Sequence, residues 1–180
     1  AGASLDLPET ADGRTEALHA FLDEHPAGRT LLAGMSLCTD AEIDPADGGA
    51  SFKTLGDPTE GALVAAAAWA GWEKTALTAA QPRVDERPFD SERKRMTTVH
   101  ALPEDGSPAA WLAPLASWLE TEGAGAIGWT KGAPAAVLEV CDRVWQEEGV
   151  QALADARRAT LAKDSEALAA QGVRVLALAM

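Results

Sequence analysis

The fold can be worked out from the stretch Pro88-Phe89-Asp90-Ser91-Glu92-Arg93-Lys94-Arg95-Met96-Thr97-Thr98-Val99. Residues 83–87 precede it and residues 96–102 overlap its end, and these two segments predict the strands of a β-hairpin, the first at a sheet edge. Phe89 stands a few residues ahead of the basic run 93–95. This arrangement suits an aromatic base that carries phosphates, because the base can stack on the ring while cations hold the phosphates.

Each part of this stretch also has a purely structural explanation. A phenylalanine at a strand end is usually part of the core, and a row of cations on an edge strand discourages pairing with another sheet. Arg95, at the end of the basic run, is expected at the surface. The functional interpretation therefore depends on what the rest of the chain offers.

Composition places the chain among ordinary globular domains. It has 180 residues, of which 47% are hydrophobic and 24% charged, so we expect one domain over residues 1–180. The formal net charge of -13 repels nucleic acid and anionic membrane surfaces, so an anionic ligand needs a local basic cluster. Cys38 and Cys141 suggest neither a disulfide framework nor a zinc site, and the three histidines lack metal or triad spacing.

The pattern of apolar residues and caps predicts an α+β fold, a largely antiparallel β-sheet flanked by helices. The clearest helix start is Asp57, followed by Pro58, with Glu60 three residues later closing a capping box. Strands are expected at 83–87, 96–102, 126–131 and 173–180, and helices at 15–25, 57–72, from 107 through Trp118, from 134, and at 150–171.

Three more residues could hold a ligand, and each has an alternative. Lys131 stands at a strand end directly before Gly132, where backbone can approach a ligand closely. Glu60 is either a capping-box partner or a ligand contact, and Arg174 is either an edge-strand gatekeeper or an anion ligand. No nucleophile elbow, Walker A loop or dinucleotide glycine fingerprint occurs, so no catalytic residue and no metal ligand is predicted.

Four stretches occur in an order that resembles the cytoplasmic nucleotide-binding domain of P-type cation-transporting ATPases, most closely the calcium-pump-like branch. They are Gly56-Asp57-Pro58-Thr59-Glu60-Gly61-Ala62-Leu63, Pro88 to Val99, Lys131-Gly132-Ala133-Pro134, and Arg174-Val175-Leu176-Ala177-Leu178-Ala179. The resemblance spans almost the whole chain. It implies the same α+β fold and an ATP or ADP site.

The resemblance assigns seven residues to the nucleotide pocket: Glu60, Phe89, Lys94, Lys131, Gly132, Arg174 and Leu176. Phe89 would stack on adenine, Glu60 would fix the adenine edge, and Leu176 would close the apolar slot. The two lysines would line the pocket, and Arg174 would reach toward the phosphates.

The resemblance also implies a longer parent chain. There, ATP with Mg²⁺ would phosphorylate an aspartate on a separate domain, and the phosphorylation and actuator domains would be partners. The parent would be an integral membrane protein, in a bacterial plasma membrane, with this domain in the cytoplasm and not touching the membrane. The domain alone would be a monomer that binds ATP without hydrolysing it.

Two departures and two rival hypotheses stand beside this interpretation. Ala135 follows the Lys-Gly-Ala-Pro turn where the family commonly has Glu, and residues 105–125 are longer than the usual hairpin, which suggests an insertion. The first rival is an acidic protein-interaction module that uses a helix carrying Trp111 and Trp118. The second is a stand-alone phosphotransferase, which ATP turnover by the chain would reveal.

Overall fold

A four-stranded antiparallel sheet with strand order β3-β4-β5-β8 forms the centre of the molecule. The computed structural model describes residues 5, 8, 10–44, 53–103, 109–146 and 149–180. The strands of this sheet are β3 (Arg83–Asp90), β4 (Arg95–Ala101), β5 (Ala126–Gly132) and β8 (Ala177–Ala179). The hairpin predicted around Phe89 is therefore confirmed, with β3 at the sheet edge.

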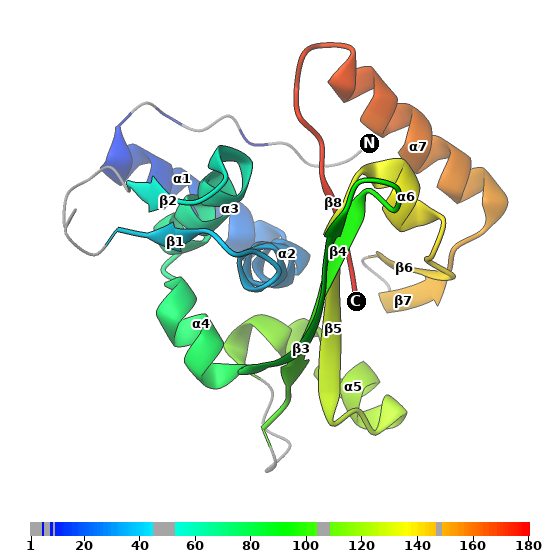
Figure 1. Cartoon of the computed structure of the whole chain (residues 1–180), viewed down its shortest axis with the longest axis horizontal. Helices are drawn as coiled ribbons and strands as arrows, with labels where there is room; N and C mark the ends of the chain where they lie inside the picture. The colour runs from blue at the N-terminus through cyan, green and yellow to red at the C-terminus, as the bar shows by residue number, and fades with distance from the viewer. Residues whose placement is uncertain (1–4, 6–7, 9, 45–52, 104–108, 147–148) are drawn as a thin grey trace.

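Helices and two short strand pairs surround the sheet. The helices are α1 (Ala11–Glu24), α2 (Ala27–Leu37), α3 (Pro58–Trp69), α4 (Lys74–Ala80), the 3₁₀ helix η1 (Ala110–Leu115), α5 (Ala116–Glu122), α6 (Pro134–Leu138) and α7 (Asp155–Ala169). The pairs are β1 (Glu42–Ile43) with β2 (Thr54–Leu55), and β6 (Arg143–Gln146) with β7 (Gly149–Ala152). Figure 1 shows the sheet edge-on, with α1 to α4 on one side and α6, α7 and the β6–β7 pair on the other. The predicted α+β fold is confirmed.

The core lies between the sheet and α2. Alternate residues of β4 are buried, and the register brings alternate residues of β5 beside them, so one face carries Met96, Thr98, His100, Ile127, Trp129 and Lys131. Trp129 is 1% exposed and is the largest fully buried side chain. A Cβ added to Gly34 of α2 would lie 2.7 Å from the Trp129 ring, so a glycine is what lets this helix pack closely on the sheet.

The start of α3 is as predicted. The Asp57 carboxylate accepts hydrogen bonds from the backbone N–H groups of Thr59, at 2.8 Å, and Glu60, at 3.2 Å. These bonds hold the pKa of Asp57 below its usual value. Pro58 occupies the first helical position, where its missing N–H has no helical partner to lose. The helix ends at Trp69 instead of near Trp72.

Two other predictions of secondary structure were partly wrong. Residues 150–152 belong to β7, and α7 begins only at Asp155. Val150 and Leu153 have a spacing that fits a helix, but residues 149–152 pair with 143–146, which lie earlier in the chain. Of the C-terminal segment 173–180, only 177–179 form a strand, because β5 pairs with these three residues alone.

The Trp-rich segment contributes to the core. Its predicted start at Ser107 and Pro108 lies outside the described residues, and the part that is described contains a 3₁₀ helix that includes Pro114. Trp111 is buried, and its indole N–H donates to the Gln81 side-chain oxygen at 3.0 Å. Trp118 is half-buried and packs against the same core. The first rival hypothesis needs both rings exposed, so this packing does not favour it.

Candidate functional site

An ion pair between α3 and β5 forms the centre of the candidate site. Glu60 Oε1 and Lys131 Nζ are 2.7 Å apart, and the two side chains are only 19% and 6% exposed. The second carboxylate oxygen, Oε2, accepts a hydrogen bond from the Asp40 backbone N–H at 3.0 Å. The Glu60 carboxylate is therefore directed at these two groups instead of closing the predicted capping box.

The surroundings of Glu60 keep its carboxylate ionised. Burial alone would raise the pKa of Glu60, but this effect is outweighed by hydrogen bonds from Lys131, Thr39 and the Asp40 backbone and by the charge of Lys131. Together they lower the pKa from 4.5 to about 2. At neutral pH the pair is thus a charged carboxylate and a charged ammonium held in position by each other. Such groups can orient the polar groups of a ligand.

We expect this lowered pKa to make stability depend on acid. The unfolded chain takes up a proton on Glu60 near pH 4.5, and the folded chain only near pH 2, so stabilisation by the carboxylate is complete above pH 4.5 and is lost as the pH falls toward about 2. Urea unfolding across this range should show the wild type losing more stability than Glu60→Gln, which has no carboxylate to protonate. Parallel losses in the two proteins would contradict the expectation.

The turn between β3 and β4 is tied to the end of β5 at Lys94. This residue has a φ of 53°, a left-handed conformation that is unfavourable for a residue with a Cβ and is often found at functional sites. Its carbonyl accepts a hydrogen bond from the Ala133 N–H at 3.0 Å. A Cβ on Gly132 would lie 2.4 Å from the same carbonyl oxygen, so glycine is required for this approach.

Gly132→Ala is expected to destabilise the chain by about 1–2 kcal/mol. The new methyl group would meet backbone atoms of Lys94 and Arg95, which cannot move aside as a flexible side chain can. Alanine also lowers the conformational entropy of the unfolded chain, which favours folding, but the steric cost is larger. Gly128→Ala on the same strand is the matched control, because its Cβ would meet only Thr97 Cγ2 at 3.9 Å. Equal urea midpoints for the two variants would show that the close packing of residue 132 on the Lys94 backbone does not require glycine.

The remaining site residues lie at the same end of the sheet. Asp90, Arg95, Gly132 and Ala177 are aligned across the four strands, and Phe89 and Lys131 each stand one residue from this row. Phe89 is 63% exposed, and Lys94, in the turn that follows β3, is also exposed.

Arg174 and Leu176 precede β8 and approach this end from the C-terminal segment. Arg174 Nη1 donates to Thr59 Oγ1 at 2.9 Å, which brings the guanidinium beside the helix turn that carries Glu60. Leu176 is half-buried and lines a cavity of about 860 Å³, whose walls also include Trp118 and Trp145. Glu60, Phe89 and Lys131 are not part of that lining.

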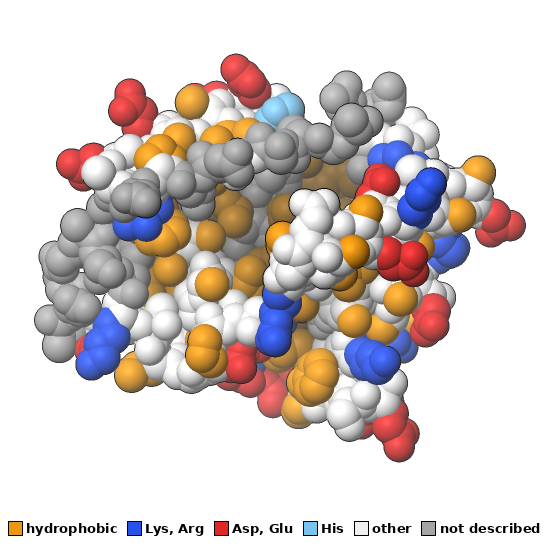
Figure 2. Space-filling model, turned by 90° about the horizontal axis from the view of Figure 1, so that it is seen from above, with side chains coloured by type: hydrophobic (Ala, Val, Ile, Leu, Met, Phe, Trp, Pro, Cys, Tyr) orange, Lys and Arg blue, Asp and Glu red, His pale blue; other side chains and the backbone are white. Residues whose placement is uncertain are grey.

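Figure 2 views the molecule from above, with this end of the sheet toward the viewer. The face is hollowed, hydrophobic side chains line the hollow, and Lys and Arg side chains stand at its margins. An apolar hollow with a few cations suits a ligand that joins an aromatic ring to anionic groups. In the described part of the chain, no group of three His, Cys, Asp or Glu could hold a metal ion, and we assign no metal ligand.

Two features of the site differ from the sequence-based expectation. Arg95 is half-buried, not at the surface, and its guanidinium donates to the Ala136 carbonyl at 3.1 Å. Thr59 was not among the seven residues assigned to the pocket, yet its hydroxyl accepts a hydrogen bond from Arg174. Its position beside Glu60 was the one available signal for this contact. The partner, 115 residues away, could not be found from local pattern.

Comparisons with known proteins agree on one family. The family model described as P-type ATPase, cytoplasmic domain N, matches residues 28–180. The chain is 33% identical over 149 residues to "Cation-transporting ATPase pma1" of Synechocystis sp., covering 83% of this chain and 14% of that protein. It is 34% identical over 151 residues to "Probable cation-transporting ATPase F" of Mycobacterium tuberculosis, covering 84% and 14%.

A third relative, "Calcium-transporting ATPase" of Bacillus subtilis, is 28% identical over 158 residues, covering 88% of this chain and 15% of that protein. The chain thus corresponds to about one seventh of the length of these relatives. Within the described residues, no helix has the length and apolar character needed to cross a membrane.

Proposed function

The chain belongs to the family of P-type ATPase cytoplasmic N domains, and from this premise we propose that it binds ATP at the end of the sheet that carries Phe89, Lys94, Lys131 and Gly132. The observation that carries the proposal is the Glu60–Lys131 pair at 2.7 Å, at the same end of the sheet as an exposed aromatic ring. The ring offers a stacking surface for adenine. The pair offers an acceptor and donors of fixed charge for the polar edge of the base.

The residues near the pair would contact different parts of the nucleotide. Lys94 is exposed and free to approach phosphates, while Lys131 is nearly buried and is held by Glu60. Arg174, whose guanidinium is bonded to Thr59, would face the phosphate end. Leu176, two residues further along the same segment, would contribute apolar surface. These cations would supply locally the attraction that a chain of net charge -13 lacks as a whole.

In a longer chain, this domain would deliver ATP, with Mg²⁺ bound to its phosphates, for phosphorylation of an aspartate on a separate domain. The phosphorylation and actuator domains would then be its partners, and cation transport the activity of the whole protein. Domain closure would bring the terminal phosphate to that aspartate. We propose the cytoplasmic side of a bacterial plasma membrane as the location.

A titration with ATP tests the proposal. Amide chemical shifts of the 180-residue chain should change saturably, with the largest changes near Phe89 and Gly132, and with an affinity between micromolar and millimolar because stacking is modest. The chain should not release phosphate from ATP. No saturable change up to several millimolar ATP would refute the proposal, and ATP turnover would favour a stand-alone phosphotransferase.

A further inference from the structure

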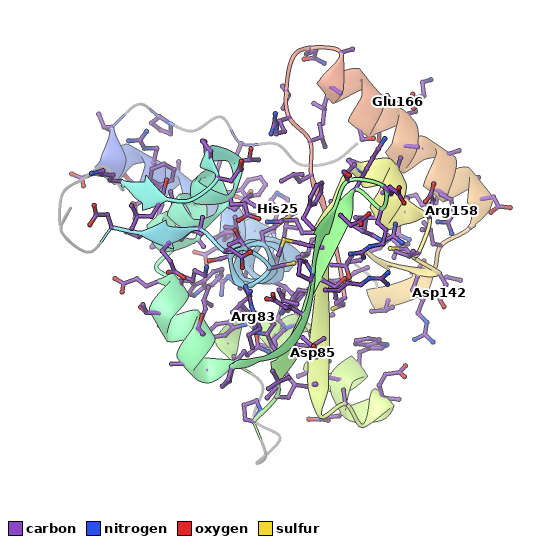
Figure 3. The ribbon with its side chains drawn as sticks, viewed as in Figure 1. His25, Arg83, Asp85, Asp142, Arg158 and Glu166 are labelled. Carbon is purple, nitrogen blue, oxygen red and sulfur yellow. The ribbon has the colours of Figure 1, made fainter. Side chains whose placement is uncertain are left out.

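Two cations hold the turn that follows α2. This 37–41 turn consists of Leu37, Cys38, Thr39, Asp40 and Ala41. Lys74 Nζ, from the first residue of α4, donates to the carbonyl of Thr39 at 2.9 Å and to that of Ala41 at 2.6 Å. Arg83 Nη2, from the start of β3, donates to the carbonyls of Leu37 at 3.1 Å and Thr39 at 2.8 Å. Figure 3 shows Arg83 reaching from β3 toward the end of α2.

The burial of Lys74 needs an explanation. The residue is 8% exposed, and an ammonium group is costly to bury unless acceptors surround it. Here the acceptors are two backbone carbonyls and the Glu42 carboxylate, at 3.0 Å. Positive charge is also favourable beside the carbonyls at the C-terminal end of a helix. The arrangement fixes a turn that would otherwise leave several carbonyls without donors.

The same turn presents its opposite side to Glu60. The backbone N–H of Asp40 donates to Glu60 Oε2 at 3.0 Å, and the Thr39 side chain also hydrogen-bonds to this carboxylate. The other oxygen, Oε1, is bonded to Lys131. An unbroken series of contacts therefore runs from Lys74 and Arg83, through the 37–41 turn, to the Glu60–Lys131 pair.

We propose that Lys74 and Arg83 are positioning residues for the nucleotide site: by fixing the 37–41 turn they fix the orientation of Glu60, and through Glu60 that of Lys131. The inference rests on the proposed function of this pair in binding ATP. In this proposal neither residue contacts the nucleotide itself. Arg83 also forms an ion pair with Asp40 Oδ1 at 2.8 Å, so it contacts a side chain of the turn as well as two of its carbonyls. A second ion pair, with Glu86 at 2.9 Å, holds the guanidinium on β3.

Lys74→Met tests the proposal, with Lys163→Met as the matched control. Lys163 is exposed on α7, so its replacement removes the same charge without touching the turn. We expect Lys74→Met to bind ATP about tenfold more weakly, a loss like that seen when groups that orient metal ligands are removed. The ¹³C resonance of the Glu60 carboxyl group should titrate at higher pH than in the control, which a general loss of stability would not cause.

Two results would overturn the proposal: a folded Lys74→Met that matches the control in both measurements, or a shifted titration with unchanged ATP affinity. If Lys74→Met does not fold, Arg83→Lys decides by the same criteria, because its ammonium keeps the charge but cannot span the Leu37 and Thr39 carbonyls as the guanidinium does. If the wild type binds no ATP, the proposed function fails, and the Glu60 titration still shows whether the turn orients the carboxylate.

Discussion

Glu60→Ala is expected to destabilise the chain by about 3–5 kcal/mol, the cost of leaving a buried charge without its partner. Lys131 is only 6% exposed at its side chain, and its ammonium contacts Glu60 at 2.7 Å. Without the carboxylate, Lys131 must lose its proton, move out of the core or stay charged and unpaired. Each outcome costs free energy. Urea unfolding at neutral pH measures the loss.

Two further variants make this prediction specific. Glu166→Ala removes a carboxylate from the exposed surface of α7, labelled in Figure 3, and should change stability by no more than about 0.5 kcal/mol. Adding Lys131→Met to Glu60→Ala should recover part of the loss, because the uncompensated ammonium is then removed and an apolar chain fills its place. If Glu60→Ala unfolds at the same urea concentration as Glu166→Ala, the pair contributes nothing to stability.

Local signals in the sequence predicted the elements that depend on neighbouring residues. Asp57 and Pro58 start α3 because capping needs only the next few N–H groups, and these lie within three residues. The β3–β4 hairpin was also predictable, because both strands flank one short turn. The four family motifs then named the residues assigned to the proposed nucleotide pocket.

Contacts between distant residues account for what the sequence left open. Glu60 has the spacing of a capping-box residue, yet its partners Asp40 and Lys131 lie 20 and 71 residues away. Lys74 opens a short helix and has no local feature that marks it as buried. Residues 150–152 are a different case, because their spacing fits a helix but they pair with the nearby residues 143–146 in a local hairpin. In each case a hydrogen bond or ion pair formed only by folding decides the outcome.

Phe89→Ala is expected to weaken ATP binding by about 1–3 kcal/mol, or about 5- to 150-fold, because a base loses its stacking partner. The ring is 63% exposed at the end of β3, so little packing is lost with it and the variant should fold as the wild type does. Val84→Ala is the matched control, since Val84 is an apolar residue of the same strand with 61% exposure.

A ligand without a base separates stacking from charge. Inorganic tripolyphosphate keeps the phosphates of ATP but offers no ring, so its affinity should be equal for wild type and Phe89→Ala, and Phe89→Trp should restore ATP binding because indole also stacks. Calorimetric titration of ATP and of tripolyphosphate into each variant measures the stacking and the electrostatic contributions to affinity separately. If Phe89→Ala weakened both ligands equally, the ring would be shaping the β3–β4 turn, and the adenine would have to lie elsewhere. Unchanged ATP affinity would remove Phe89 from the site, leaving the Glu60–Lys131 pair without its stacking surface.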